Sequence, residues 1–280
     1  MISVPVSASR VISPTRVLSA QRLMTGAIAG LAAYPIYAMS FDGEKDYVEA
    51  PLSPNISSQS NYTVEFMIYM ISYDPQTDTF FHFHSSPATW RFQMRQLPET
   101  TLRYNVEKDG ASYYYDSNRR VELGVWQQID MVFDSTKVRF YFDGTKTAEH
   151  DRVEEDPYTF VGVWLVSESG YAWFVNCYMA FLRIYNRALS DSEIQHNCLN
   201  PMSPIIDDLI LWLDARKVVN DLWPDLSGYG NDGVIYGAEW IAVEKPSAET
   251  EIIIGWNARI SGHEYVSTVR PAARVIPCSR

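Results

Sequence analysis

Hydrophobic and polar residues alternate through most of the middle of this chain. In residues 62–73, YTVEFMIYMISY, the alternation places Val64, Phe66 and Ile68 on one face of an extended strand. Residues that favour tight turns, such as the pair Asp143-Gly144, separate runs of this kind at strand-like intervals. The pattern predicts an antiparallel meander of strands, because no long segment of helical period separates one strand from the next.

Two neighbouring runs, residues 125–133 and 137–142, supply the clearest core prediction. Alternation along both runs points one set of large apolar side chains inward, namely Ile129, Met131, Phe133, Phe140 and Phe142. A single short helix is expected at residues 190–198, SDSEIQHNC. Ser190 can cap its first turn, and Glu193 completes a capping box three residues later.

The composition agrees with an all-β fold. Hydrophobic residues make up 46% of the chain and aromatic residues 14%, including 18 Tyr and 8 Trp, and aromatic residues favour strands over helices. A length of 280 residues suffices for one large β domain with extensions or for two small domains. We expect one main core.

The formal net charge of −11 is unevenly spread. Residues 1–41 contain Arg10, Arg16 and Arg22 but no acidic residue, and residues 257–280 contain four Arg against one Glu. Without these two ends the chain has 16 basic and 33 acidic residues, a charge of about −17. Such an acidic body excludes nucleic-acid binding, which needs a basic face. We expect the three N-terminal arginines to contact an acidic protein partner instead.

An uncharged stretch follows these arginines. Residues 23–41 are interrupted by Gly26, Gly30 and Pro35, whereas a membrane-spanning helix needs about 20 strongly apolar residues, so we predict no transmembrane segment. A short apolar run behind a basic, acid-free stretch is also typical of a signal or transit peptide. We expect residues 1–38 to be retained as an N-terminal arm.

Four stretches carry a family resemblance. Residues 40–51, SFDGEKDYVEAP, match an opening strand and turn, and residues 61–70, NYTVEFMIYM, the core strand after it. Residues 124–148 match a central hairpin, and residues 181–194, FLRIYNRALSDSEI, a closing strand and helical turn. In this order they resemble the concanavalin A-like, laminin-G-like jelly-roll domains. The resemblance implies a two-sheet antiparallel jelly-roll sandwich.

A fifth stretch stands in an unusual place. Residues 209–240 resemble a segment that in this family comes just before the opening strand, but here they follow the closing helix. We expect residues 201–254 to be strands moved to the C-terminus by circular permutation, where they complete the sandwich of residues 39–200. A partial second repeat is the alternative, and whether these strands insert into their own chain or a neighbour's is open. Residues 255–280 are then a C-terminal arm.

Many members of the family bind calcium through carboxylates on loops. The resemblance places Asp42, Asp46 and Asp225 in acidic loops and makes them the candidate calcium ligands. Where the family often has an Asp-Glu pair before its closing strand, this chain has Ala180 and Phe181. We therefore expect no obligatory cofactor, with calcium as the alternative, and interpret the three aspartates as turn residues.

Catalysis on this fold has one template, the paired carboxylates of β-glucanases. The nearest pair is Glu154 and Asp156, but Pro157 breaks their strand. His82 and His84 share one strand face and could chelate a transition metal. Because no third ligand is evident, we interpret them as surface or packing residues. We predict that the protein is not an enzyme.

Aromatic residues supply the candidates for glycan binding, because sugars stack on flat rings. We select Tyr114, within the three tyrosines at 113–115, and Trp90 as ligand-contacting candidates. Trp164 and Trp173 are further aromatic residues, but alternation buries half of each strand, so most such rings are expected in the core.

The three cysteines, Cys177, Cys198 and Cys278, are widely spaced and form no CxxC pair. This spacing indicates neither a zinc site nor a disulfide framework. We expect free buried thiols, with one Cys177–Cys198 or Cys198–Cys278 bridge as the alternative.

Two functions from different classes fit these observations. The first is a non-catalytic structural subunit of a large homo- or hetero-oligomeric assembly, most plausibly a virion surface, decoration or cementing protein with a lectin-like module. The alternative is a secreted module that binds carbohydrate or protein, as lectins and adhesion proteins do. Both place the protein at a virion or extracellular surface, with protein subunits or glycans as partners. A subunit of an organelle complex is a third interpretation.

Overall fold

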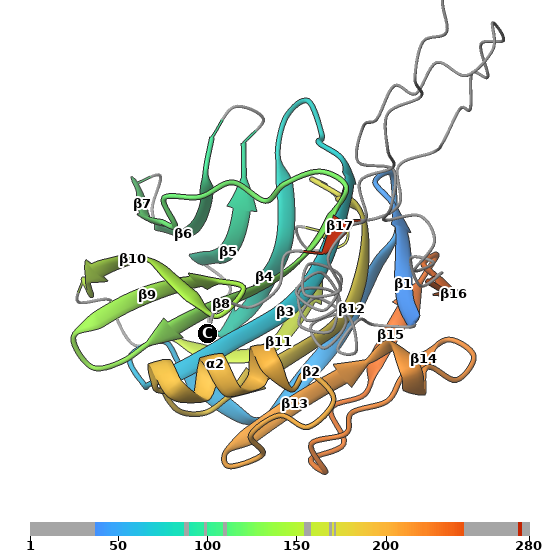
Figure 1. Ribbon diagram of the computed structural model, residues 1–280. Coiled ribbons are helices and arrows are strands. Elements are labelled where there is room, and N and C mark those ends of the chain that lie inside the picture. The colour runs from blue at the N-terminus through green and yellow to red at the C-terminus, as the bar shows by residue number, and fades with distance from the viewer. Residues whose placement is uncertain are drawn as a thin grey trace, which may run out of the picture.

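The computed structural model describes residues 37–243, apart from residues 87–89, 98–99, 109–110, 154–157, 168–169 and 171, and also residues 274–275. In this part of the chain the strands form two sheets that pack face to face, with an α-helix across the outside (Figure 1). The predicted all-β sandwich of two antiparallel sheets is therefore confirmed.

The nine-stranded sheet follows the order β10-β9-β8-β3-β12-β1-β16, with β13 beside β12 and β17 beside β8. Its strands are β1 (Tyr37–Asp42), β3 (Tyr62–Ser72), β8 (Val125–Phe133), β9 (Lys137–Phe142), β10 (Thr145–Asp151), β12 (Asn176–Tyr185), β13 (Leu209–Asp214), β16 (Glu239–Ala242) and β17 (Arg274–Val275). Strand β17 runs parallel to β8 and lies opposite Val125 and Trp126. These two residues of the expected C-terminal arm thus lie on the sheet.

The eight-stranded sheet follows the order β14-β15-β2-β11-β4-β5-β6-β7. Its strands are β2 (Tyr47–Ser57), β4 (Asp78–Ser86), β5 (Trp90–Gln96), β6 (Leu102–Lys108), β7 (Ala111–Asp116), β11 (Thr159–Leu165), β14 (Leu222–Trp223) and β15 (Gly233–Tyr236). A short 3-10 helix, η1 (Ala215–Lys217), follows β13.

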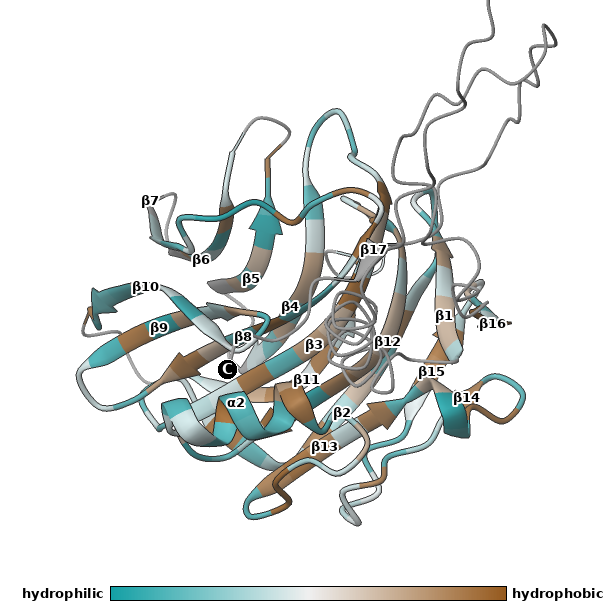
Figure 2. Ribbon diagram, viewed as in Figure 1, coloured by the Kyte–Doolittle hydropathy of each residue, from teal (hydrophilic) through white to brown (hydrophobic). Residues whose placement is uncertain are grey.

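The core fills the space between the two sheets, and Figure 2 shows hydrophobic residues along strands such as β12 and β13 and hydrophilic residues on β10. The predicted core residues are at most 1% exposed: Ile129, Met131, Phe133, Phe140 and Phe142. Across from them, the rings of Phe83 and Phe160 stack with centroids 4.4 Å apart, and Tyr62 meets both rings edge-on. Truncating a side chain in such a core costs about 2–5 kcal/mol.

The strands that follow the helix join both sheets. Strand β13 pairs with β12, β16 pairs with β1, and β15 pairs with β2 in the other sheet. Residues 209–242 therefore complete the sandwich of their own chain. The domain boundaries expected at residues 38, 200 and 254 stay predictions.

Helix α2 (Asp191–Leu199) begins where the sequence predicts it. Ser190 Oγ accepts a hydrogen bond from the backbone N–H of Glu193, and the Glu193 carboxylate accepts one from the backbone N–H of Ser190, which confirms the capping box. Arg187 donates two hydrogen bonds to Glu193, and they lower the pKa of this carboxyl to about 2. Ile194 packs the helix against Tyr141 on the nine-stranded sheet.

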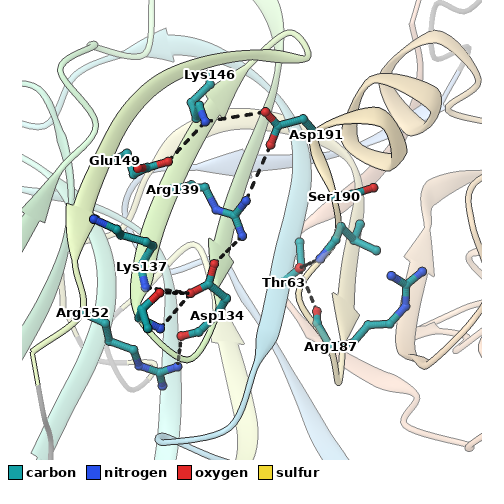
Figure 3. A network of polar contacts seen from close by, with 12 residues as sticks. Thr63, Asp134, Lys137, Arg139, Lys146, Glu149, Arg152, Arg187, Ser190 and Asp191 are labelled. Atoms are coloured by element: carbon teal, nitrogen blue, oxygen red, sulfur yellow. Dashed lines mark hydrogen bonds and ion pairs between the residues drawn. The ribbon is translucent and has the colours of Figure 1, made fainter.

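An ion-pair network joins the start of α2 to the β9–β10 hairpin (Figure 3). Nitrogen atoms of Arg139 lie 2.7 Å from Asp134 Oδ2 and 3.6 Å from Asp191 Oδ1, and Lys146 Nζ lies 3.6 Å from Asp191 Oδ2. Tyr141 donates its hydroxyl to Asp191 at 2.7 Å. Because the Asp191 side chain is 60% exposed, these contacts orient the helix more than they stabilise it.

Beneath α2, a charged network is closed to water. Glu65 on β3 lies opposite Asp130 on β8 and opposite Arg183 on β12, and all three residues are 0% exposed. Arg183 Nη1 lies 3.1 Å from Glu65 Oε2, and Asn197 of α2 donates to the same oxygen at 3.2 Å. Burial and the charge of Glu65 raise the pKa of Asp130 well above its usual value. The network is a structural element that links helix and sheet.

The cysteines differ in state. Cys177 is a free thiol, and its burial raises its pKa. Cys198 is disulfide-bonded. The expectation of a free thiol is therefore wrong for Cys198, and a Cys177–Cys198 bridge is excluded. Cys278 lies outside the described residues.

Candidate functional site

The outward face of the eight-stranded sheet carries a line of polar and aromatic side chains. The strand register sets them opposite one another on six neighbouring strands, and residues directly opposite in a sheet share a face. We call this set the outer row: Glu49, Trp164, His82, Gln93, Asn105 and Tyr114. The next residues along two of these strands, Val163 and Phe83, are buried between the sheets, so the row faces away from the core.

Trp164 is the centre of an aromatic patch on this row. Its ring centroid lies 5.4 Å from that of His82, and its ring also lies against His84. Gly162 makes room for the His84 ring, because a Cβ at this position would lie 3.3 Å from His84 Nδ1 and 2.9 Å from the Ala50 carbonyl oxygen. The patch presents flat ring surfaces beside imidazole nitrogen atoms.

Three side chains on the same face have buried polar atoms that lack hydrogen-bond partners. Gln93 is 0% exposed, and neither its amide oxygen nor its amide nitrogen has a partner. Thr79 Oγ1 and His84 Nε2 are also buried without a partner. A buried polar group left unpaired costs about 1–3 kcal/mol, so three together on one face indicate a place for water or a ligand.

Arginines flank the polar end of the row and are held in place. With its amide oxygen turned toward Arg95, Asn105 accepts two hydrogen bonds from the Arg95 guanidinium. Arg103 lies 4.5 Å from the centroid of the Tyr114 ring and 3.0 Å from the Asp116 carboxylate. These contacts fix the Asn105 amide and the Tyr114 ring in defined positions.

The imidazole of His84, beside the outer row, is electrically neutral. Burial, and then the neighbouring His82, lower the pKa of His84 to about 3, so this imidazole carries no charge at pH 7. His84 Nδ1 lies 3.7 Å from Glu49 Oε1, but with a neutral imidazole the contact is not an ion pair.

An apolar end continues the row beyond Glu49. The rings of Tyr47 and Tyr236 stack with centroids 4.4 Å apart. Val234 lies opposite Glu49, and Leu222 lies opposite Val234. Val234, Tyr236 and Leu222 are 39–44% exposed, so the face changes from polar near Tyr114 to apolar near Leu222.

Of the residues predicted to contact a ligand, only Tyr114 has a described side chain. Tyr114 lies on the outer row and is 56% exposed. Trp90 begins β5, but its side chain lies outside the described residues, as do Arg10, Arg16 and Arg22. Trp164 is half-buried on the outer row, and the half-buried Trp173 lies 5.8 Å from the Arg95 guanidinium carbon, so neither is a fully buried core residue.

The structure does not bring the three candidate calcium ligands together. Asp42 and Asp46 share one turn, in which Asp46 Oδ2 accepts a hydrogen bond from the Asp42 backbone N–H at 3.0 Å. Asp225 instead accepts hydrogen bonds from the backbone N–H groups of Trp212, Ser227 and Asn231. Asn231 Oδ1 accepts a hydrogen bond from the backbone N–H of Ser53. Ser53 lies seven residues beyond Asp46, roughly 23 Å away on an extended strand, so the Asp225 loop is far from Asp46. Among the described residues, no group of three or more His, Cys, Asp or Glu side chains could hold a metal ion.

The acidic residues considered for catalysis form no site in the described structure. Glu154 and Asp156 lie outside the described residues. The acidic pair that the fold does create, Glu65 and Asp130, is 0% exposed on the other sheet. A small pocket near that sheet, lined in part by Met67, has room for little more than one water molecule.

Sequence reasoning missed most of the outer row. His82 and His84 were predicted as surface or packing residues, and Gln93 and Asn105 were not selected at all. A polar residue between two apolar residues on a strand is the usual pattern of a solvent-exposed position, so it gave no sign of a site. The signal was present in the alternation of residues 90–96, WRFQMRQ, which sets Gln93 on the face opposite Phe92 and Met94. Only the register of six strands shows that these polar residues form one line.

Comparison with known proteins agrees with this architecture. A family model described as the concanavalin A-like lectin/glucanases superfamily matches residues 42–195. Among solved structures, the chain is similar to a Bacteroides ovatus protein named for a proposed carbohydrate-binding role, with 16% identity and a TM-score of 0.57 over 75% of this chain and 60% of that one. It is also similar to the mouse laminin alpha1 chain, with 12% identity and a TM-score of 0.44 over 55% of this chain and 43% of that one.

No curated protein matches the chain. At 16% identity, the similarity to the Bacteroides ovatus protein shows a shared fold and no more. Within the described residues, no helix is long and apolar enough to span a bilayer. The family match, however, covers more than half of the sequence. The chain therefore belongs to the concanavalin A-like lectin/glucanases superfamily.

Proposed function

We propose that this protein is a non-catalytic carbohydrate-binding module whose outer row holds a linear oligosaccharide. The observation that carries the proposal is Gln93, a fully buried amide with no partner for either polar atom, placed between the Trp164 patch and Asn105. An amide both donates and accepts hydrogen bonds. It therefore suits sugar hydroxyl groups, which also do both.

The surroundings of Gln93 match the general chemistry of a ligand site. Such sites combine apolar or aromatic surface with a few fixed polar groups, and here Trp164 and Tyr114 supply rings while Gln93 and Asn105 supply amides. Trp164 on β11 and Tyr114 on β7 are four strands apart, about 19 Å at the usual strand spacing. A chain of several sugar units is long enough to reach both rings.

The absence of catalysis is part of the proposal. Hydrolysis of a glycosidic bond normally uses two carboxyl groups that flank it, and Glu49 is the one carboxylate among the described side chains of the outer row. The buried Glu65–Asp130 pair lies on the opposite sheet beneath α2, where a polysaccharide does not reach it. We therefore propose binding without turnover.

We propose an extracellular or surface location, because Cys198 is disulfide-bonded and structural disulfides persist in oxidising compartments. The role as a virion subunit stays a prediction. It relies on Arg10, Arg16, Arg22 and the terminal segments, most of which lie outside the described residues.

Two neighbouring tyrosines provide a matched test. Tyr114 lies opposite Asn105 on the outer row, whereas Tyr113 lies opposite the core residue Val106 and so belongs to the other face, and the two side chains are 56% and 52% exposed. A panel of linear oligosaccharides is screened with the full chain, and each ligand found is titrated by calorimetry. We expect Tyr114→Ala to weaken binding roughly 10-fold, the loss of about 1.4 kcal/mol, and Tyr113→Ala to leave it unchanged.

Equal losses in the two variants would place the ligand elsewhere on β7. If no oligosaccharide of the panel binds at millimolar concentration, the proposed function fails. Turnover of a bound glycan, detected as new reducing ends, would contradict the non-catalytic part alone.

A further inference from the structure

A second line of side chains runs beside the outer row on the same face of the eight-stranded sheet. The strand register sets Thr79 opposite Arg95, Arg95 opposite Arg103, and Arg103 opposite Asp116. Arg95 lies two residues along β5 from Gln93 of the outer row, so the two lines are roughly 7 Å apart. We call these four residues the second row: Thr79, Arg95, Arg103 and Asp116.

Trp173 stands at the Thr79 end of the second row. Its carbonyl oxygen accepts a hydrogen bond from the backbone N–H of Thr79 at 3.1 Å. Its half-buried ring has its centroid 5.8 Å from the guanidinium carbon of Arg95. The same guanidinium donates two hydrogen bonds to the amide oxygen of Asn105 on the outer row. Arg95 therefore joins the Trp173 ring to the proposed ligand site.

The backbone of Trp173 has a conformation that a large side chain rarely adopts. Its φ is 54°, which lies in the left-handed region, where a bulky residue is strained. Strained backbone of this kind clusters at ligand sites and persists only where the surrounding structure holds it. Here the hydrogen bond from Thr79 and the contact with Arg95 hold it. The fold thus keeps this ring beside Thr79 in spite of the strain.

Thr79 supplies a polar group next to the Trp173 ring. Thr79 is 0% exposed, and its hydroxyl oxygen has no hydrogen-bond partner. A hydroxyl group both donates and accepts hydrogen bonds, so a buried one without a partner suits a hydroxyl group of a ligand. The Thr79 end of the second row therefore repeats the combination found on the outer row, an aromatic ring beside an unpartnered polar group.

We propose that Trp173 and Thr79 form a subsite for a branch of the oligosaccharide, so that the ligand class is a branched glycan. This inference rests on the proposed function, because the main chain of that glycan lies along the outer row. Thr79 is a diagonal neighbour of Gln93, roughly 7–8 Å away. A single-sugar branch on the unit above Gln93 therefore reaches Thr79 and the Trp173 ring.

Matched pairs of glycans test the subsite in the full chain. The probes are gluco-, xylo- and manno-oligosaccharides, each as an unbranched chain and as the same chain with one single-sugar branch, titrated by calorimetry. For the main chain that binds, we expect the branch to strengthen binding to the wild type roughly 10-fold. Trp173→Gly should abolish this gain, because it removes the ring while glycine keeps a positive φ without strain.

Thr79→Val tests the hydroxyl group alone. It keeps the shape of the side chain, and the hydroxyl group that it removes has no partner in the protein. The melting temperature should therefore stay the same, while the branched glycan binds roughly 3- to 10-fold more weakly. The matched control is Thr147→Val on β10 of the other sheet, where the hydroxyl group bonds to the Phe140 carbonyl oxygen. It should leave the affinity for both glycans unchanged.

The outcomes separate this inference from the proposed function. Unbranched chains that bind as tightly as every branched partner would overturn the branch subsite and leave the proposed function standing. A gain from the branch that survives both Trp173→Gly and Thr79→Val would place the branch elsewhere, and it would also overturn the inference. If neither member of any pair binds, the proposed function fails and the subsite fails with it.

Discussion

Glu65 and Gln93 are both 0% exposed polar residues in the middle of an outer sheet face, but only Glu65 has hydrogen-bond partners. Glu65 accepts hydrogen bonds from Gln128 at 2.6 Å, from Arg183 at 3.1 Å and from Asn197 at 3.2 Å. Gln93 has no partner for either amide atom. The comparison separates a face whose buried polar group is paired with the helix from a face whose buried polar group has no partner.

The difference has a physical basis. A buried charge must be paired, because leaving it alone costs several kcal/mol, and so the network around Glu65 is fixed by the fold. A neutral amide without partners costs less, about 1–3 kcal/mol, and the cost ends when a ligand or water supplies the bonds. Some atoms of the Glu65 network also lack partners, such as Asp130 Oδ2, but each of those side chains is held by another bond.

The largest effect is expected from breaking the charged face. Arg183→Met removes the partner of Glu65 and leaves a buried carboxylate unpaired, which should lower the free energy of unfolding by roughly 3–5 kcal/mol. Urea denaturation measures this loss. The double variant Glu65→Gln with Arg183→Met should recover most of it, and failure to recover would mean that Arg183 stabilises mainly through its bond to the Pro201 carbonyl oxygen.

Removing the largest ring from the other face should change binding more than stability. We expect Trp164→Ala to weaken oligosaccharide affinity roughly 10- to 100-fold, the range for losing an aromatic contact worth 1.4–2.8 kcal/mol. The control is Tyr229→Ala, which removes a 53% exposed ring from the loop between β14 and β15. A titration in which both variants bind like the wild type would contradict the role of Trp164.

A smaller effect is expected from the pH dependence of the charged face. Burial raises the folded-state pKa of Asp130 above its usual 3.8, so the unfolded chain loses this proton first as pH rises, and stability falls from about pH 4 upward. Asp130→Asn should therefore match the wild type near pH 4 and exceed it at pH 8.

Melting curves across this pH range test the prediction. Asp151→Asn, which alters a side chain that is 90% exposed, should leave the pH profile unchanged. An Asp130→Asn profile that runs parallel to the wild type would contradict the raised pKa.

The smallest effect is expected from chelation. Asp225 is held by backbone N–H groups and lies apart from Asp42 and Asp46, so we predict that a metal ion is not needed to fix these loops. We expect the same melting temperature with and without EDTA. A fall of many degrees on chelation would show that calcium is structural.

Much of the fold could be predicted from the sequence because it depends on local patterns. Alternation marked the core strands, such as residues 129–133, and Ser190 with Glu193 marked the start of α2. The outer row could not be predicted, because it depends on how six strands align across 65 residues or more of sequence, as with Glu49 and Tyr114. The calcium candidates came from a family resemblance, and in the structure Asp225 accepts hydrogen bonds from Trp212 on β13 and from Ser227 in its own loop.

One substitution tests most directly the claim that the outer row is kept for a ligand. Gln93→Met preserves the size of the side chain but removes an amide that has no partner in the protein. The account predicts that the free energy of unfolding stays the same or rises, because an unpaired buried amide is lost, while oligosaccharide affinity falls at least 10-fold. A variant that unfolds more easily by several kcal/mol and yet binds sugar like the wild type would show that Gln93 serves the fold, and it would contradict the account.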